Sequence, residues 1–186
     1  MGMPARAGWT VDMLESLPDD GQRYEIIDGE LFVTPAPARS HQLVLAALFS
    51  RLEAYLRAST VGRLLFAPVD VRRGPKRNVQ PDLLAVRLDA LRANEGPFDF
   101  SDVLLVVEAL SPTTARADWH VKRPLYQSVG IPQYWLVDID ARSIHRWLPS
   151  DDRPQVLADR IEWQPVGMDV PLVIDIVAMF REALED

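Results

Sequence analysis

Two apolar runs that each contain a single carboxylate constrain the fold of this chain most strongly. Residues 79–86 (VQPDLLAV) and 103–110 (VLLVVEAL) read as strands, and Asp82 and Glu108 are the only charges in them. Burying an unpaired carboxylate is costly, so such an acid usually has a charged partner or a metal ion. The run around Glu108 lacks polar alternation, which predicts a central strand covered on both faces.

Lysine is scarce in a chain that otherwise uses arginine for its cations. Of the 20 basic residues, only Lys76 and Lys122 are lysines. Arginine stays protonated and presents a planar fork, whereas lysine is a compact charge with a tunable pKa. Lys76 falls in a Gly-Pro loop and Lys122 in an organised segment, which favours Lys122 for a role that arginine cannot fill.

Composition limits the classes of protein to which this chain can belong. Its 186 residues are 48% hydrophobic and 25% charged, which predicts a single domain over 1–186, with a core at about 22–149 and a C-terminal extension over 150–186. The absence of cysteine excludes disulfides and thiol catalysis. No apolar run reaches the roughly 18 residues of a membrane span, and the first 20 residues contain no apolar stretch typical of a signal peptide. We therefore expect a cytoplasmic protein without a membrane partner.

Local patterns predict an α/β fold in which helices flank a mixed sheet, preceded by an N-terminal hairpin. Asp28-Gly29 favours a two-residue type I′ turn that pairs Ile27 with Glu30 and Glu25 with Phe32. Glu25 and Glu30 then share one face, from which a third carboxylate could approach the two isolated acids.

The remaining elements follow from periodicity and from breaker residues. Ser40 is the expected N-cap of a helix to about residue 58, with a buried stripe at Leu45, Leu48, Leu52 and Leu56. Further helices are predicted over residues 10–17, 111–129 and up to 183, strands over 63–66, 69–72, 133–138, 143–148 (as an edge strand) and 170–174, and mostly loop over 88–101.

Asp82, Glu108 and Lys122 together suggest metal-assisted hydrolysis of a phosphodiester. Mg²⁺ takes oxygen ligands, usually one or two carboxylates with waters and phosphate oxygens. Lysine beside the attacking water could position it, or act as a base if its pKa is depressed. In the structural alternative, Asp82 caps a turn and Glu108 is the buried partner of an arginine.

Six segments, taken in order, resemble the Uma-two family of restriction endonucleases in the PD-(D/E)XK nuclease superfamily. They are residues 24–31 (YEIIDGEL), 40–42 (SHQ), 79–83 (VQPDL), 107–114 (VEALSPTT), 122–126 (KRPLY) and 130–138 (GIPQYWLVD). The resemblance implies a restriction-endonuclease-like fold and an endonuclease that cuts DNA with Mg²⁺ or Mn²⁺, held by Asp82 and Glu108. The usual lysine position, two residues after the second acid, is Leu110 here, and the resemblance implies that Lys122 on the next helix takes this role.

Other polar residues leave two interpretations open. His41 is either a structural residue at a helix start or a phosphate contact, and Glu30 is either a hairpin-edge acid or a further metal ligand. The basic run, which consists of Arg72, Arg73, Lys76 and Arg77, is either a solvated face or a nucleic-acid contact.

The sequence is compatible with three functions. The first is a metal-dependent DNA endonuclease, for which a homodimer would suit the cutting of two strands. The second is a noncatalytic nucleic-acid-binding or assembly module that retains the fold, which the net charge of −7 and Leu110 favour. The third is a metal-dependent hydrolase of another phosphate ester.

Overall fold

The computed structural model describes residues 8–14, 16–34, 36–93 and 95–185, and its centre is a six-stranded mixed sheet. Strands β7 and β8 of this sheet are parallel, and its other neighbouring strands are antiparallel. Its spatial order is β10 (Gln155–Leu157), β9 (Ser143–Trp147), β8 (Tyr134–Asp138), β7 (Val103–Ala109), β6 (Leu83–Arg87) and β3 (Gly62–Phe66). A four-stranded antiparallel sheet consists of β2 (Glu30–Thr34), β1 (Arg23–Ile27), β5 (Arg77–Val79) and β4 (Val71–Arg72), and β11 (Arg160–Trp163) pairs with β12 (Leu172–Asp175).

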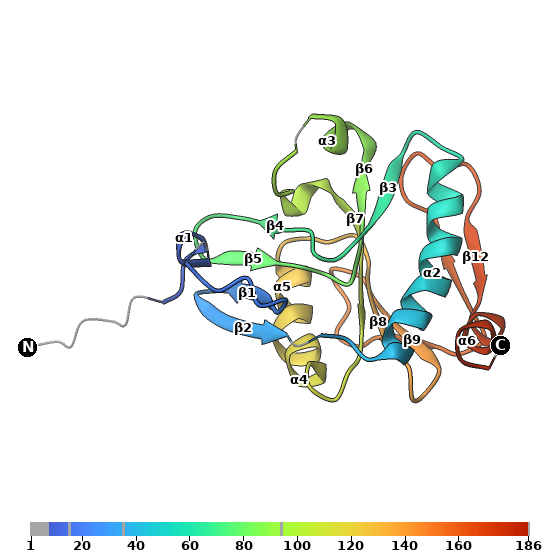
Figure 1. Ribbon diagram of the computed structural model, residues 1–186. Coiled ribbons are helices and arrows are strands. Elements are labelled where there is room, and N and C mark those ends of the chain that lie inside the picture. The colour runs from blue at the N-terminus through green and yellow to red at the C-terminus, as the bar shows by residue number, and fades with distance from the viewer. Residues whose placement is uncertain (1–7, 15, 35, 94, 186) are drawn as a thin grey trace, which may run out of the picture.

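Both faces of the six-stranded sheet are covered. Helices α2 (Arg39–Arg57) and α6 (Ile176–Leu184) form one apolar core with one face of the sheet, together with β11 and β12. Helix α5 (Arg123–Ser128) and the four-stranded sheet form a second core with the other face. Figure 1 shows α2 beside β12 and α6, with α5 on the side of the hairpin. Strand β7 is interior and buried on both faces, as the lack of polar alternation in its sequence predicts.

The N-terminal hairpin has the predicted turn and register. Asp28 and Gly29 adopt φ values of 50° and 86°, and Ile27 pairs with Glu30 while Glu25 pairs with Phe32. Glu25 is buried and Glu30 is exposed.

Helix α2 buries the predicted leucine stripe but begins earlier than predicted. Leu45, Leu48, Leu52 and Leu56 are all buried. The N-cap is Ala38, which makes no side-chain capping bond, and Ser40 lies inside the helix. The prediction of Ser40 as N-cap is therefore wrong.

Proline divides the first apolar run between two sheets. Strand β5 ends at Val79 and β6 begins at Leu83, so the predicted continuous strand over residues 79–86 does not form. Pro81 has no N–H to donate to a sheet partner, which explains the break. Asp82 consequently lies at the corner where the chain passes from the four-stranded to the six-stranded sheet.

The helix predicted over residues 111–129 is three short segments. Helix α4 (Ala115–Ala117) leads into a π-helical turn (Asp118–Lys122), which leads into α5. Pro124 cannot donate to the carbonyl four residues earlier and its ring crowds that carbonyl, which favours widening of the preceding turn.

Several smaller elements also differ from the sequence prediction. Helix α1 (Val11–Leu14) is shorter than the predicted 10–17, of which residue 15 lies outside the described residues. Helix α3 (Leu88–Ala93) and a 3₁₀ turn (Phe100–Asp102) occupy the predicted loop over 88–101. Strand β9 is not an edge strand, because β10 pairs with its outer side. The sequence prediction includes neither β10 nor β11. Strand β10 has only three residues and no apolar alternation. Among the described residues, no helix has the length and apolarity needed to cross a bilayer.

Candidate active site

Asp82 and Glu108 meet where β6 and β7 lie side by side. The antiparallel register pairs Leu83 with Val107, so Asp82, which precedes Leu83, lies next to Glu108, which follows Val107. Oδ2 of Asp82 accepts a hydrogen bond of 2.9 Å from the backbone N–H of Ala109. Both acids line a cavity of about 230 Å³.

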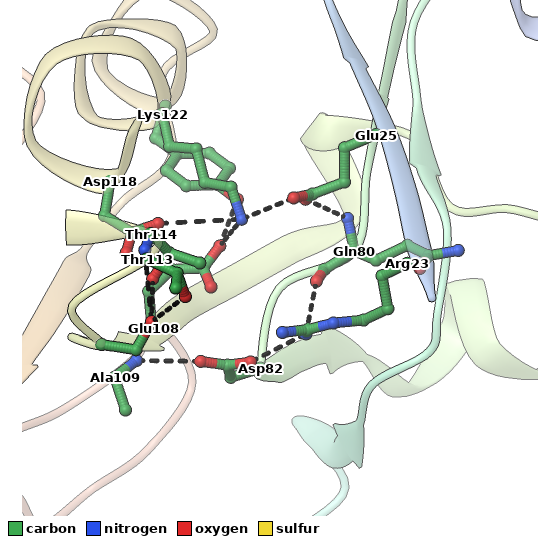
Figure 2. Close-up of polar contacts among 12 residues, drawn as sticks. Arg23, Glu25, Gln80, Asp82, Glu108, Ala109, Thr113, Thr114, Asp118 and Lys122 are labelled. Atoms are coloured by element: carbon green, nitrogen blue, oxygen red, sulfur yellow. Dashed lines mark hydrogen bonds and ion pairs between the residues drawn. The ribbon is translucent and has the colours of Figure 1, made fainter. Parts of the chain in front are cut away.

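Lys122 reaches the same cavity from the π-helical turn. Its Nζ lies 2.9 Å from Oε1 of Glu108 and 2.8 Å from Oε2 of Glu25. Oδ1 of Asp118, one helical turn earlier, lies 3.8 Å from the same nitrogen. Figure 2 shows the lysine side chain extending from the helix into the space between these carboxylates. The three residues that sequence analysis placed in one site therefore line one cavity.

Glu25, rather than Glu30, is the third carboxylate of this cluster. Oε1 of Glu25 accepts a hydrogen bond of 2.8 Å from the backbone N–H of Gln80, which fixes its orientation. Glu30 shares the hairpin face but is exposed beside the turn. The sequence limited a third acid to this face, but the choice depends on the pairing of β1 with β5, which brings Glu25 next to the chain that leads into Asp82.

Asp82 is held by two further side chains. Nη1 of Arg23 lies 2.7 Å from Oδ1 of Asp82, and Nε2 of His41 lies 3.0 Å from Oδ2. His41 is buried in the first turn of α2. Its Nδ1 is buried and has no hydrogen-bond partner among the described residues. Arg23 carries no motif, and sequence reasoning missed it.

Burial and charge act differently on the two isolated acids. Burial raises the pKa of Asp82, but the hydrogen bond with His41 and the charge of Arg23 outweigh burial and bring this pKa well below its usual range. Burial raises the pKa of Glu108 strongly, and nearby Asp82, Asp118 and Glu25 add to this rise although Lys122 opposes it. Asp118 has a raised pKa for the same reasons. The cavity thus contains one firmly ionised acid and two acids that resist ionisation.

Lys122 does not have the depressed pKa that a general base would need. Burial lowers its pKa, but the charges of Glu108, Glu25 and Asp118 outweigh burial and raise this pKa well above its usual value. The ammonium form therefore persists at neutral pH, and the suggested role as a base does not hold.

The donor set fits a divalent cation. Four carboxylates face two permanent cations, Arg23 and Lys122. Burial raises the pKa values of Glu108 and Asp118, and the neighbouring acids add to this rise. In the described part of the chain, no group of three or more His, Asp or Glu side chains is arranged to hold a metal ion by itself. Mg²⁺ does not require such a group, because waters and substrate oxygens commonly complete its shell.

The basic run lies apart from the acids, at the opposite end of β5 from Asp82 and close to α1 (Figure 1). Three of its four cations have acidic partners: Arg72 with Asp70 at 2.8 Å, Arg73 with Asp99 at 2.7 Å and Arg77 with Asp28 at 2.6 Å. The fourth, Lys76, is exposed.

Comparison with known proteins agrees with this architecture. A crystal structure of a putative nuclease belonging to DUF820 from Anabaena variabilis matches with a TM-score of 0.75 and 18% sequence identity, covering 94% of this chain and 99% of that one. At this identity the likeness shows a shared fold. No curated protein matches the sequence. The model of the Uma2 family, described as "Putative restriction endonuclease", matches residues 11–177. The chain therefore belongs to the Uma2 family and has its restriction-endonuclease-like α/β fold.

Proposed function

We propose that this protein is a metal-dependent endonuclease that hydrolyses phosphodiester bonds of DNA. The observation that carries the proposal is the position of Lys122. Leu110 occupies the usual lysine position, yet the ammonium of Lys122 lies 2.9 Å from Oε1 of Glu108. An acid just before β6, an acid on β7 and a lysine thus line one cavity, although the lysine comes from a later part of the chain than position 110.

Asp82 and Glu108 would hold the metal ion, Mg²⁺ or Mn²⁺. When bound, such an ion lowers the pKa of a coordinated water and offsets charge on the phosphate. Asp82 is the firmer ligand because its pKa is lowered, and the N–H of Ala109 fixes its orientation. Oε1 of Glu108 is fixed by the hydroxyl of Tyr126 at 3.0 Å as well as by Lys122.

The protonated Lys122 would act on the substrate through its charge. Its ammonium can donate a hydrogen bond to the attacking water or to a nonbridging phosphate oxygen, which stabilises the charge that develops there. Glu25 and Asp118 keep it protonated and hold it at the cavity. Lys122 is not the catalytic base, because it stays protonated.

The proposal is tested with supercoiled plasmid and single-stranded circular DNA incubated with MgCl₂, MnCl₂ or chelator. We expect nicking that requires metal and falls at least about 100-fold in Asp82→Asn, Glu108→Gln and Lys122→Met. Glu162→Gln and Asp159→Asn make the same chemical changes at exposed positions and serve as matched controls. Cleavage that survives chelator and Asp82→Asn would rule out this site.

The noncatalytic nucleic-acid-binding module is the second candidate. The ion pair between Arg23 and Asp82 favours it, because Arg23 occupies one oxygen that a metal would use. Titration calorimetry separates the two: DNA binding without binding of Mg²⁺ or Mn²⁺ would support the second candidate. Cytoplasmic location and a homodimer remain part of the proposal for the first.

A further inference from the structure

A second cavity, of about 670 Å³, opens beside the catalytic cavity. The two share Arg23, His41 and Asp82 in their walls, so a ligand at the acids can extend into the second space without leaving the protein surface. This volume lies within the roughly 300–1,000 Å³ of pockets that bind small organic groups. We call this second space the side groove.

An aromatic ring forms part of the wall of the side groove. Phe66, at the end of β3, is 44% exposed, which is high for so large an apolar residue. Its ring stacks on Phe49 of α2, with centroids 4.1 Å apart and planes 18° from parallel. Phe49 therefore supports the ring of Phe66 from one side. Nucleobases stack on aromatic side chains presented in this way.

Two polar atoms at the side groove lack protein partners. Oε1 of Gln80 and Nδ1 of His41 are buried and make no hydrogen bond within the described residues, although both side chains line this groove. Nε2 of Gln80 donates to Asp70 and Nε2 of His41 contacts Asp82, so the orientation of both side chains is fixed. Buried polar atoms normally have partners, so these two atoms are unsatisfied polar groups behind the wall of the side groove.

The charges of the surface disfavour binding to a continuous duplex. Duplex binding rests mainly on cations that neutralise phosphates. Three cations of the basic run are already paired with acids, Arg23 is paired with Asp82, and the net charge is −7. Contacts to bases would add to binding at this site, and a duplex keeps its bases stacked and paired.

We propose that the substrate is a single strand of nucleic acid whose base enters the side groove and stacks on Phe66. The adjoining phosphate then lies at Asp82, Glu108 and Lys122. This inference rests on the proposed nuclease function and adds the substrate class to it. DNA and RNA strands share the chemistry concerned, and the experiment tests them separately.

The test measures binding and cleavage with the same set of strands. Fluorescence anisotropy with Ca²⁺ in place of Mg²⁺ compares a labelled DNA strand, an RNA strand of the same sequence and the DNA duplex, for wild type, Phe66→Leu and Phe66→Trp. We expect a single strand to bind and be cut at least about tenfold better than the duplex, with that preference lost in Phe66→Leu and retained in Phe66→Trp. Val173→Ala, at an exposed apolar residue of β12, is the control.

A strand that carries 2-aminopurine reports stacking directly. We expect its fluorescence to change at one position next to the cleaved bond, and the change to disappear in Phe66→Leu. Equal binding and cutting of strand and duplex, or identical behaviour of Phe66→Leu and wild type, would overturn the inference while leaving the nuclease proposal intact. A change from dimer to monomer in Phe66→Leu without loss of strand binding would overturn it too, because Phe66 would then be a subunit contact. Failure of the proposed function itself would appear as no cutting of any substrate.

Discussion

The ammonium of Lys122 lies 2.9 Å from Oε1 of Glu108, although one residue belongs to a π-helical turn and the other to a central strand. Both side chains are almost completely buried. Glu25 and Asp118 complete the surroundings of the lysine, so one cation serves three carboxylates. The three acids raise the pKa of Lys122, because each of them stabilises the ammonium. Burial is the largest cause of the raised pKa of Glu108, and the neighbouring acids add to it because they oppose its ionisation.

Removal of the lysine charge should destabilise the fold. We expect Lys122→Met to lower the free energy of unfolding by about 3–5 kcal/mol, because the buried carboxylates lose their counter-charge. Urea unfolding measures this, and Lys76→Met at an exposed lysine should change it by less than about 0.5 kcal/mol. The double variant Lys122→Met/Glu25→Gln should recover part of the loss. A double variant that is less stable than the additive sum would contradict the charge argument.

Replacement of Glu108 should change how stability depends on pH. The folded-state pKa of Glu108 is raised above its unfolded value of about 4.3, so the folded state holds more protons and the free energy of unfolding falls as pH rises from there. Glu108→Gln removes this loss and should be more stable than wild type at pH 8 by about 1 kcal/mol or more. The pKa of Asp82 is lowered, so its contribution to the free energy of unfolding has the opposite sign and is lost only at acidic pH, in both proteins. Parallel stability curves from pH 4 to 8 would refute this account, and Glu162→Gln is the control.

Divalent cations should raise the melting temperature through the same acids. At a concentration tenfold above its Kd, Mg²⁺ or Mn²⁺ stabilises the folded state by about 1.4 kcal/mol, which raises the melting temperature by about 4 °C for a chain of this size. We expect the shift in the wild type, its reversal by chelator, and a much smaller shift in Asp82→Asn and Glu108→Gln. Differential scanning calorimetry measures this without reference to activity. An undiminished shift in both variants would place the cation elsewhere.

Arg23 should oppose metal binding. Its guanidinium lies 2.7 Å from the Asp82 carboxylate, so a cation that binds there is repelled and meets one occupied oxygen. We expect Arg23→Gln to bind Mn²⁺ several-fold more tightly by calorimetry. If Arg23 also contacts the substrate phosphate, the variant should show a higher KM for cleavage. Weaker Mn²⁺ binding in Arg23→Gln would show that the arginine orients Asp82 for the metal.

Pro124 should control where the ammonium points. Pro124→Ala restores a backbone N–H and favours a regular helix through residues 118–122. We expect cleavage to fall by about tenfold because Lys122 rotates away from Glu108. The free energy of unfolding should fall by less than in Lys122→Met, because the restored backbone hydrogen bond offsets part of the lost ion pairing. A crystal structure of the variant would show the turn directly. Full activity with a regular helix would mean that the π-helical turn has no role in placing the lysine.

Sequence reasoning succeeded where local pattern and covalent chemistry decide the outcome. The Asp28-Gly29 turn follows from the positive φ values that these residues tolerate, and the two-residue turn sets the hairpin register. The leucine stripe of α2 follows from the 3.6-residue period of the helix. The isolated acids were conspicuous because burial of a carboxylate is costly wherever the chain places it. Elements with weak patterns, such as β10 and the segmented helix after Ser111, were missed or misjudged because packing and Pro124 decide them.

The residues of the site were readable in the chain, but their mutual positions were not. Isolation of Asp82 and Glu108 in apolar runs, and the scarcity of lysine, pointed to three side chains. Which hairpin acid joins them depends on the pairing of β1 with β5, and Arg23 enters only because β1 lies beside the corner at Pro81. The basic run looked available for phosphates, yet folding pairs Arg73 and Arg77 with acids far away in the chain. Sequence shows which charges must be buried, whereas the charge that each one meets depends on contacts between segments far apart in the chain.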